Sequence, residues 1–245
     1  MSSSSRTWRQ RVFRIATAAQ TISSATLGSV LIVHLAAPVV ASLTGPAAVD
    51  MSNQMILLGR EWYQRAWIEP VLVYGSFSLH ILSSLVRRAL LHRPTLCWPW
   101  HWRWETWHSV CGWILTPLVC AHVLVNRIVP QQSSLPISGL SPSELDMSYV
   151  SYALAASPIT TWSVYVLLSV TGAVHIVGGA MKLMRRRKMR VRAQYGLTTA
   201  FALAAMLLVG TSAIAQDGLA SVAPTAMERM AACYRQVVPW RWVGI

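Results

Sequence analysis

The chain has 245 residues, of which 54% are hydrophobic and 12% charged, and its mean hydropathy is +0.43. This composition excludes an ordinary soluble domain, because several apolar runs reach the roughly 20 residues that cross a bilayer core. The net charge of +13 does not indicate nucleic-acid binding, since the basic residues flank the apolar runs.

Five apolar runs predict an all-α membrane fold with five transmembrane helices, over residues 21–43, 67–91, 109–129, 158–184 and 195–214. Pro158 suits the first turn of the fourth helix. The chain then divides into a basic N-terminal segment (1–20), a five-span membrane domain (21–215) and an interfacial C-terminal tail (216–245). The N-terminal segment resembles a mitochondrial transit peptide. The first span follows it at once, which favours a basic juxtamembrane anchor.

The charges separate cleanly when the loops are assigned to alternating sides of the membrane. The side that holds the N-terminus carries fifteen Lys and Arg and one acidic residue, and the opposite side carries six and seven. The two net charges, +14 and −1, agree with the total of +13. This asymmetry supports five spans and predicts a cytosolic N-terminus.

Four histidines lie one in each of the first four predicted spans: His34, His80, His122 and His175. Because successive spans run in opposite directions, His34 and His122 share one depth, and His80 and His175 share another. An ionisable side chain inside a membrane is costly and indicates a functional site. Two facing imidazoles are what a six-coordinate haem iron takes from a protein.

The sequence therefore predicts one or two haem b groups, with all four histidines as iron ligands. A flat porphyrin also needs small residues on neighbouring helices, and these are present at Gly28, Gly75, Gly112, Gly172, Gly178 and Gly179. Small residues equally promote plain helix packing. The alternative is a cofactor-free bundle in which the histidines bond across helices.

Charged residues near the spans allow two interpretations each. Arg60, Glu61, Arg65 and Glu69 have near-helical spacing, which predicts an amphipathic interfacial helix with i,i+4 pairs. In the other interpretation, Arg60 or Arg65 contacts a haem propionate or a lipid headgroup. Arg127 is either an interface anchor or a propionate partner. No catalytic motif is present, and we do not expect an enzyme.

Three segments resemble the fungal MCP family, whose members are mitochondrial outer-membrane proteins of lipid homeostasis. They are "LLGREWYQRAWIEPVLVYGSFSLHILSSLVRR" (57–88), "GWILTPLVCAHVLVNRIVP" (112–130) and "SYVSYALAASPITTWSVYVLLSVTGAVHIVGGAMKL" (148–183). The histidine layout also resembles the cytochrome b anchors of succinate dehydrogenase and fumarate reductase. In those anchors, ligands from the first and third histidine-bearing helices hold one haem, and those from the second and fourth hold the other.

These resemblances imply a cytochrome-b-like four-helix core plus a fifth helix, in the mitochondrial outer membrane. They imply membrane lipids as partners, together with a bridge-like lipid-transfer protein on the cytosolic side, and no nucleic acid or soluble catalytic subunit. Two features depart from the family pattern. Tyr152 stands where members tend to have a histidine, and the N-terminus lacks the Pro-x-Pro segment of some members, since no proline precedes Pro38.

Two alternative functions follow from the same residues. A dihaem cytochrome b anchor would pass electrons to or from quinone and would need soluble flavin and iron–sulfur subunits. A cofactor-free helical membrane scaffold would use the histidines as hydrogen-bonding groups between helices.

Overall fold

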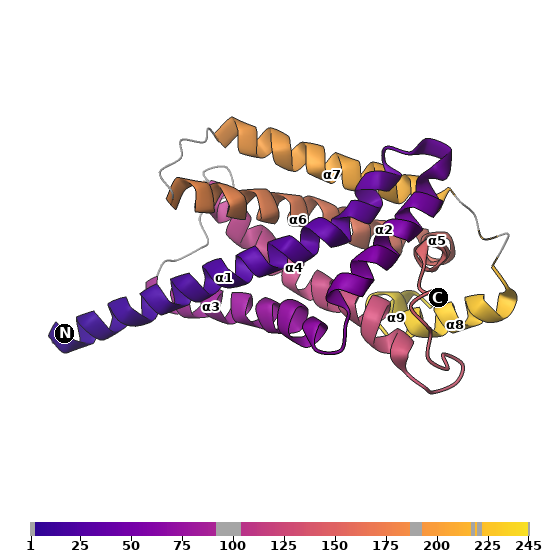
Figure 1. Cartoon of the computed structure of the whole chain (residues 1–245), viewed down its shortest axis with the longest axis horizontal. Helices are drawn as coiled ribbons and strands as arrows, with labels where there is room; N and C mark the ends of the chain where they lie inside the picture. The colour runs from indigo at the N-terminus through magenta and orange to yellow at the C-terminus, as the bar shows by residue number, and fades with distance from the viewer. Residues whose placement is uncertain (1–2, 92–103, 187–192, 217–218, 220–221, 245) are drawn as a thin grey trace.

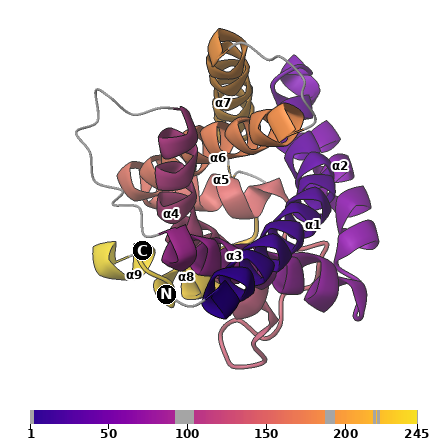
Figure 2. The ribbon, with the colours of Figure 1, turned by 90° about the vertical axis from the view of Figure 1, so that its left-hand side faces the viewer.

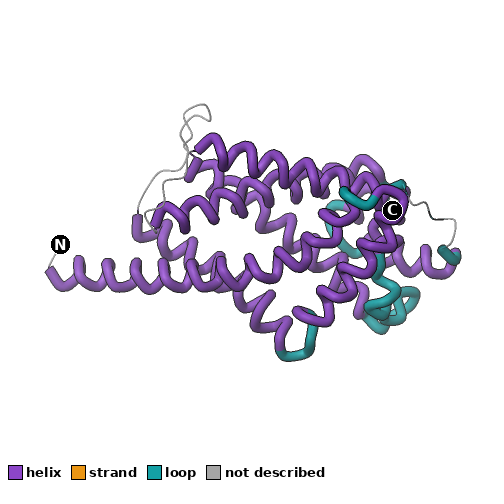
Figure 3. The backbone as a smooth tube through the Cα atoms, turned by 45° about the horizontal axis from the view of Figure 1, so that its top comes forward, coloured by secondary structure: helices purple, strands orange, loops and turns teal. Residues whose placement is uncertain are grey.

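A computed structural model describes residues 3–91, 104–186, 193–216, 219 and 222–244. Within these ranges every regular element is helical and none is a strand, so the predicted all-α class is confirmed (Figure 3). Asp217 and several basic residues of the charge argument lie outside the described residues. These basic residues are Arg93, Arg103, Arg187, Lys188, Arg190 and Arg192.

The first helix is much longer than the predicted span. Helix α1 runs from Ser3–Ala41, so the basic N-terminal segment and the first span form one continuous helix. No glycine or proline interrupts the chain before Gly28. Its hydroxyl groups, such as that of Thr21, donate to carbonyls one turn earlier. The helix ends at Ala41, three residues after Pro38. In the turn that follows, Gly45 adopts a φ of +53°, which glycine tolerates well.

The chain then turns back on itself in a helix that the sequence did not indicate over its full length. Helix α2 (Ala48–Tyr63) packs antiparallel to the end of α1. A Cβ added at Gly59 would lie 3.1 Å from Val33 Cγ1, so this glycine allows close approach. The pairing brings Arg60 and Tyr63 back toward the middle of the bundle.

The predicted second span is a π-helical turn, η2 (Pro70–Gly75), followed by α3 (Ser76–Leu91). It is not among the four described helices that are long and apolar enough to cross a membrane: Thr7–Ala41, Thr106–Gln131, Pro158–Arg185 and Gln194–Ala215. Five spans are therefore not confirmed. A break at residues 64–67 separates this segment from α2, and its serines and His80 make it less apolar.

The other predicted spans are confirmed as helices. They are α4 (Trp104–Val123), extended by the π-helical turn η4 (Leu124–Ile128) and the short η5 (Val129–Gln131); α6 (Pro158–Arg186); and α7 (Ala193–Ala215). Pro158 begins α6 as predicted. Large apolar side chains such as Ile159 and Phe201 are 85% and 77% exposed on the outer surface, as expected for contact with lipid.

Helices α1 and α7 cross closely at one point and diverge away from it (Figure 1). A Cβ added at Gly210 would overlap the carbonyl oxygen of Pro38, so only glycine fits there. Viewed end-on, α6 lies between α4 and α7, and α3 lies beside α1 (Figure 2). Helices α1 and α7 are therefore closest to each other at the end opposite the start of α1.

That end is covered by a packed cap, made of loop 132–146 with α5 (Met147–Ala156), α8 (Pro224–Arg235) and α9 (Trp240–Val243). Tyr149, Tyr234 and Trp240 are buried in its core. The Trp240 indole donates to Thr161 Oγ1 at 2.9 Å. The C-terminal tail is thus more than an interfacial strip, although Trp242 is 78% exposed and faces outward.

Candidate functional site

The four histidines of the predicted spans meet in two pairs. The rings of His34 (α1) and His122 (α4) lie 5.9 Å apart between centroids, with their planes at 81°. Those of His80 (α3) and His175 (α6) also lie 5.9 Å apart, at 82°. These are the pairs that the alternating span directions predict. We call them the cap-side pair (His34 and His122) and the N-side pair (His80 and His175).

Two helices independently give the separation of the pairs along the bundle. On α1, Ser24 contacts His80 and lies ten residues before His34. On α6, Tyr165 contacts the ring of His122 and lies ten residues before His175. At 1.5 Å per residue, both helices place the pairs roughly 15 Å apart.

The cap-side pair is held by one phenol and one amide. His34 Nδ1 lies 3.1 Å from the hydroxyl of Tyr63, which α2 brings back toward the bundle. His122 Nδ1 lies 3.2 Å from the Asn126 amide nitrogen. Burial raises the pKa of Tyr63, so this phenol stays neutral.

The N-side pair is held from α1 and α4. His80 Nδ1 lies 3.4 Å from Ser23 Oγ and 3.3 Å from Ser24 Oγ. Both serine hydroxyls donate to the carbonyl oxygen of Gln20. His175 Nδ1 donates to the carbonyl oxygen of His108 at 2.9 Å.

His108 is a further member of this site that the sequence analysis did not identify. Its ring stacks on His175 at 4.2 Å between centroids, with 9° between the planes. Its Nδ1 donates in turn to the carbonyl oxygen of His175 at 2.9 Å. The two residues thus form a reciprocal link between α4 and α6.

Glycines make room for this link. A Cβ at Gly112 would lie 2.6 Å from His175 Cε1, and one at Gly178 would lie 2.8 Å from His108 Cβ. These glycines accommodate imidazole rings, whereas the sequence analysis assigned them to a porphyrin face. By contrast, a Cβ at Gly28 meets nothing within 4 Å, and one at Gly172 meets only Leu115, at 3.9 Å. The feature of the sequence that could have pointed to His108 is its position one helical turn before Gly112.

The charged residues near the cap-side pair have protein partners. Arg127 donates two hydrogen bonds to Glu69, from Nε at 2.7 Å and from Nη2 at 2.6 Å. Tyr74 also donates to Glu69, which is only 8% exposed. Neither interpretation of Arg127 anticipated this pairing.

Arg60 and Arg65 bond to backbone carbonyls. The Arg60 guanidinium donates to the carbonyl oxygens of Pro142 and Leu145, each at 2.7 Å, and so ties α2 to the cap loop. Arg65 lies just beyond the end of α2, and its Nε donates to the carbonyl oxygen of Glu61.

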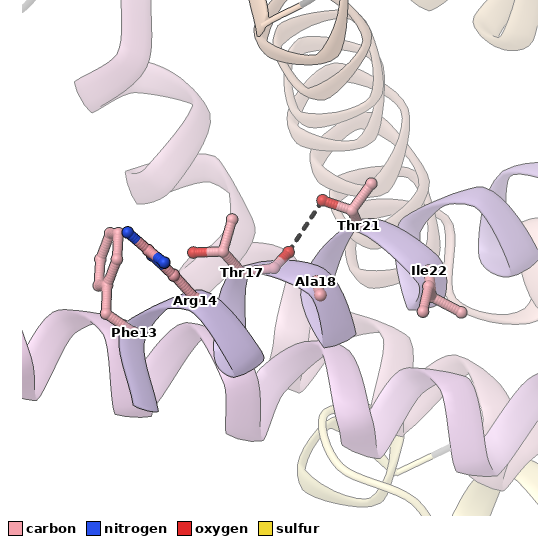
Figure 4. Close-up of a pocket in the computed structure, with 6 residues that line it drawn as sticks. All are labelled: Phe13, Arg14, Thr17, Ala18, Thr21 and Ile22. Carbon is pink, nitrogen blue, oxygen red and sulfur yellow. Dashed lines mark hydrogen bonds between the residues drawn. The ribbon is translucent and has the colours of Figure 1, made fainter. Parts of the chain in front are cut away.

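A shallow hollow lies on the outer side of α1, near the N-side pair. Figure 4 shows its lining, which comes entirely from α1. The lining residues are Phe13, Arg14, Thr17, Ala18, Thr21 and Ile22. None of the histidines lines it.

The histidine pairs fit the protein's share of a haem site. The porphyrin supplies four iron ligands, so the protein needs to supply two. Each candidate histidine has a protein group within hydrogen-bonding distance of its Nδ1, and a metal-ligating histidine usually donates its second ring N–H to such a group. Two metal–nitrogen bonds of about 2 Å, plus the ring radii, would set the centroids about 6 Å apart, close to the 5.9 Å observed.

Comparison with known proteins gives one match. Residues 117–223 match the family model described as the MDM10-complementing protein 1 transmembrane domain. No curated protein and no solved structure matches the chain. The matched segment includes His122 and His175, begins within α4 and ends at the residue before α8. This match supports an MCP-family membrane protein.

Proposed function

We propose that this chain is a non-enzymatic, integral protein of the mitochondrial outer membrane that acts in lipid homeostasis and holds haem b between paired intramembrane histidines. The family match supports an integral membrane protein, and the resemblance to the MCP family is the ground for the outer membrane and for lipid homeostasis. The single observation that carries the haem proposal is the pairing of His34 with His122 and of His80 with His175, with Nδ1 anchored in every ring. One or both pairs hold the iron.

We propose five membrane spans, with α3 and its preceding turn as the second. Elements η2 and α3 together contain 22 residues, near the roughly 20 that a bilayer core requires. Arg9 donates to the carbonyl oxygen of Leu90, so α3 ends beside the start of α1. Segment 70–91 therefore returns the chain to the N-terminal end of the bundle.

The N-terminal end of the bundle is basic, and we assign it to the cytosol. Its described basic residues include Arg9, Arg11, Arg14, Arg87, Arg88, Lys182 and Arg185. Acidic residues lie instead at the capped end, among them Asp50, Glu61, Glu69, Glu144 and Asp146. Positive charge marks the cytosolic side. The basic surface is suited to anionic lipid headgroups and to an acidic surface on a lipid-transfer protein.

Bound haem would supply one-electron redox chemistry. The chain's own residues would do three things: ligate the iron through Nε2, fix the ring orientations through Nδ1, and exclude water through the surrounding apolar helices. Near the cap-side pair, Arg127 is neutralised by Glu69, whereas Arg60 bonds to backbone carbonyls and keeps its positive charge.

The decisive test is the visible spectrum of the detergent-purified protein, oxidised and dithionite-reduced, with haem quantified per chain. We expect sharp reduced b-type bands that disappear when the ligand histidines are replaced by leucine. Protein expressed with ample haem supply that binds none would overturn the haem proposal. In cells lacking their own MCP-family protein, the chain should restore mitochondrial phospholipid composition; no restoration would contradict the lipid-homeostasis role.

A cofactor-free scaffold is the second candidate, favoured by the reciprocal link between His108 and His175. That link shows that histidines in these spans also serve as bonding groups between helices. A haem-free protein that still restores lipid composition would support this candidate.

A further inference from the structure

We infer that the two histidine pairs are not equivalent: the N-side pair is arranged to ligate iron, whereas the cap-side pair is a hydrogen-bonded helix link, so that each chain holds one haem. This inference deepens the proposed function and rests on it. It follows from the direction of each hydrogen bond to Nδ1, because a neutral imidazole carries its proton on one nitrogen and a lone pair on the other.

In His175 the bonding partner fixes the tautomer. Its Nδ1 lies 2.9 Å from the backbone carbonyl oxygen of His108, and a carbonyl can only accept. Nδ1 must therefore carry the proton, which leaves the lone pair on Nε2. Stacking against His108, with Gly112 beneath the ring, holds this orientation.

In His80 the same tautomer follows from its two serine contacts. A serine hydroxyl has one proton to donate, and both Ser23 and Ser24 direct theirs at the carbonyl oxygen of Gln20. Toward His80 Nδ1, at 3.4 and 3.3 Å, these oxygens can therefore only accept. Nδ1 carries the proton, so both rings of the N-side pair offer Nε2 lone pairs for metal binding.

In His122 the bond runs in the opposite direction. The Asn126 amide nitrogen donates to the carbonyl oxygen of His122 at 2.9 Å, which fixes this nitrogen, and not the amide oxygen, on the His122 side. The same nitrogen lies 3.2 Å from His122 Nδ1. An amide nitrogen can only donate, so Nδ1 accepts and the ring proton lies on Nε2. A protonated Nε2 has no lone pair for iron.

The fourth histidine, His34, has a partner that does not determine its tautomer. Tyr63 can donate to His34 Nδ1 or accept from it. Because a six-coordinate iron needs both axial nitrogens, the state of His122 alone removes the cap-side pair as a bis-histidine site. Its contacts connect Tyr63 on α2, His34 on α1 and Asn126 on η4, which makes it a link between three elements.

Haem quantification on single variants tests the assignment. We expect one haem per chain in the unaltered protein, none in His80→Leu or His175→Leu, and one in His34→Leu and His122→Leu. Gel filtration confirms that each variant is folded, and the retained haem is an internal check in the cap-side variants. Two haems in the unaltered protein, or loss of haem in the cap-side variants alone, would overturn the inference while leaving haem binding intact.

Asn126→Asp provides a gain-of-binding test. A carboxylate accepts the Nδ1 proton of His122 and returns the lone pair to Nε2, as in carboxylate–histidine–metal sites. We expect the haem content to rise from one toward two per chain. An unchanged content, with the haem of the N-side pair retained, would contradict the tautomer explanation.

A second measurement does not depend on haem. Nitrogen-15 NMR of histidine-labelled, haem-free protein distinguishes protonated Nδ1 from protonated Nε2. We expect His80 and His175 to carry the proton on Nδ1 and His122 to carry it on Nε2; the reverse at His122 would overturn the inference. If no preparation binds haem but the tautomers are as stated, the proposed function fails and the hydrogen-bond assignment stands.

Discussion

His108 and His175 each donate a ring hydrogen bond to the other's backbone carbonyl oxygen, both at 2.9 Å, across the contact between α4 and α6. An interhelical hydrogen bond in a membrane protein is worth roughly 0.6 kcal/mol and at most about 1.7. The pair, with its stacked rings, is therefore a small but specific constraint on how these two helices align.

Replacing His108 by leucine should lower the free energy of unfolding by roughly 1 kcal/mol, because the bond to the His175 carbonyl is lost. Unfolding in mixed detergent, followed by circular dichroism, measures this change. His108→Asn is the matched control, since its amide nitrogen can occupy the place of Nδ1 and should recover most of the loss. Equal losses in both variants would mean that shape, not the hydrogen bond, matters at this position.

Gly112→Ala should be clearly destabilising, because the added methyl group would lie 2.6 Å from the His175 ring. Overpacking of this kind typically costs about 1–3 kcal/mol. Gly28→Ala is the control, since nothing lies within 4 Å of its added methyl group and alanine is the better helix former. The thermal midpoint should fall in the first variant and stay level or rise in the second. No difference between them would argue against the close contact at Gly112.

Gly210→Ala should weaken the crossing of α1 and α7, where the added methyl group would overlap the Pro38 carbonyl oxygen. This obstacle is backbone, which cannot move aside without shifting a helix. We expect a loss of roughly 1–3 kcal/mol. Gly172→Ala, with its single neighbour at 3.9 Å, should be nearly neutral in the same unfolding assay. Comparable stability of the two variants would contradict the crossing.

The pairing of Glu69 with Arg127 predicts a non-additive mutant cycle. This ion pair is partly buried, with the Arg127 and Glu69 side chains 21% and 11% exposed, so removing one partner leaves a partly desolvated charge unpaired and costs more than removing both. Glu69→Gln should thus destabilise more than the double change Glu69→Gln with Arg127→Gln. Arg65→Gln, at an exposed position, serves as the control and should have little effect. Additive losses would show that the pair is not coupled.

The proposed five-span topology places opposite ends of the bundle on opposite sides of the membrane. Single cysteines are introduced at Arg11 and at Ser143, both of which are exposed. In intact mitochondria, the two cysteines should differ in their labelling by a maleimide that cannot cross the outer membrane. We expect Arg11→Cys to react first and Ser143→Cys to react only after detergent is added. Labelling of both before detergent would contradict this orientation.

The features that could be predicted from the sequence are those that depend on the direction of successive spans and on the length of the apolar runs. The pairing of His34 with His122, and of His80 with His175, follows from alternating spans alone and is observed. The helices around residues 109–129, 158–184 and 195–214 follow from continuous apolar runs and are also observed. Whether these histidines hold haem stays a prediction.

Features that depend on side-chain contacts could not be predicted in this way. Helix α2 is polar on one face and packs against α1, so no apolar run marks it. His108 lies at the edge of a predicted span, and no feature of the sequence places its ring against His175. The partners of Arg60 and Arg127 come from loop 132–146 and from Glu69, more than 50 residues away in the chain. The length of α1 was missed because charge, not helix-breaking residues, set the predicted boundary.

The contact between Gly210 and Pro38 also gives the bundle a mechanical direction. Helices α1 and α7 are held together near the cap and spread apart toward the other end, where the outer surface of α1 is hollowed (Figures 1 and 4). Two helices that are in contact near one end separate most readily at the other. Separation of α1 from α7 should therefore concentrate toward the start of α1, while the two helices stay in contact near Pro38 and Gly210.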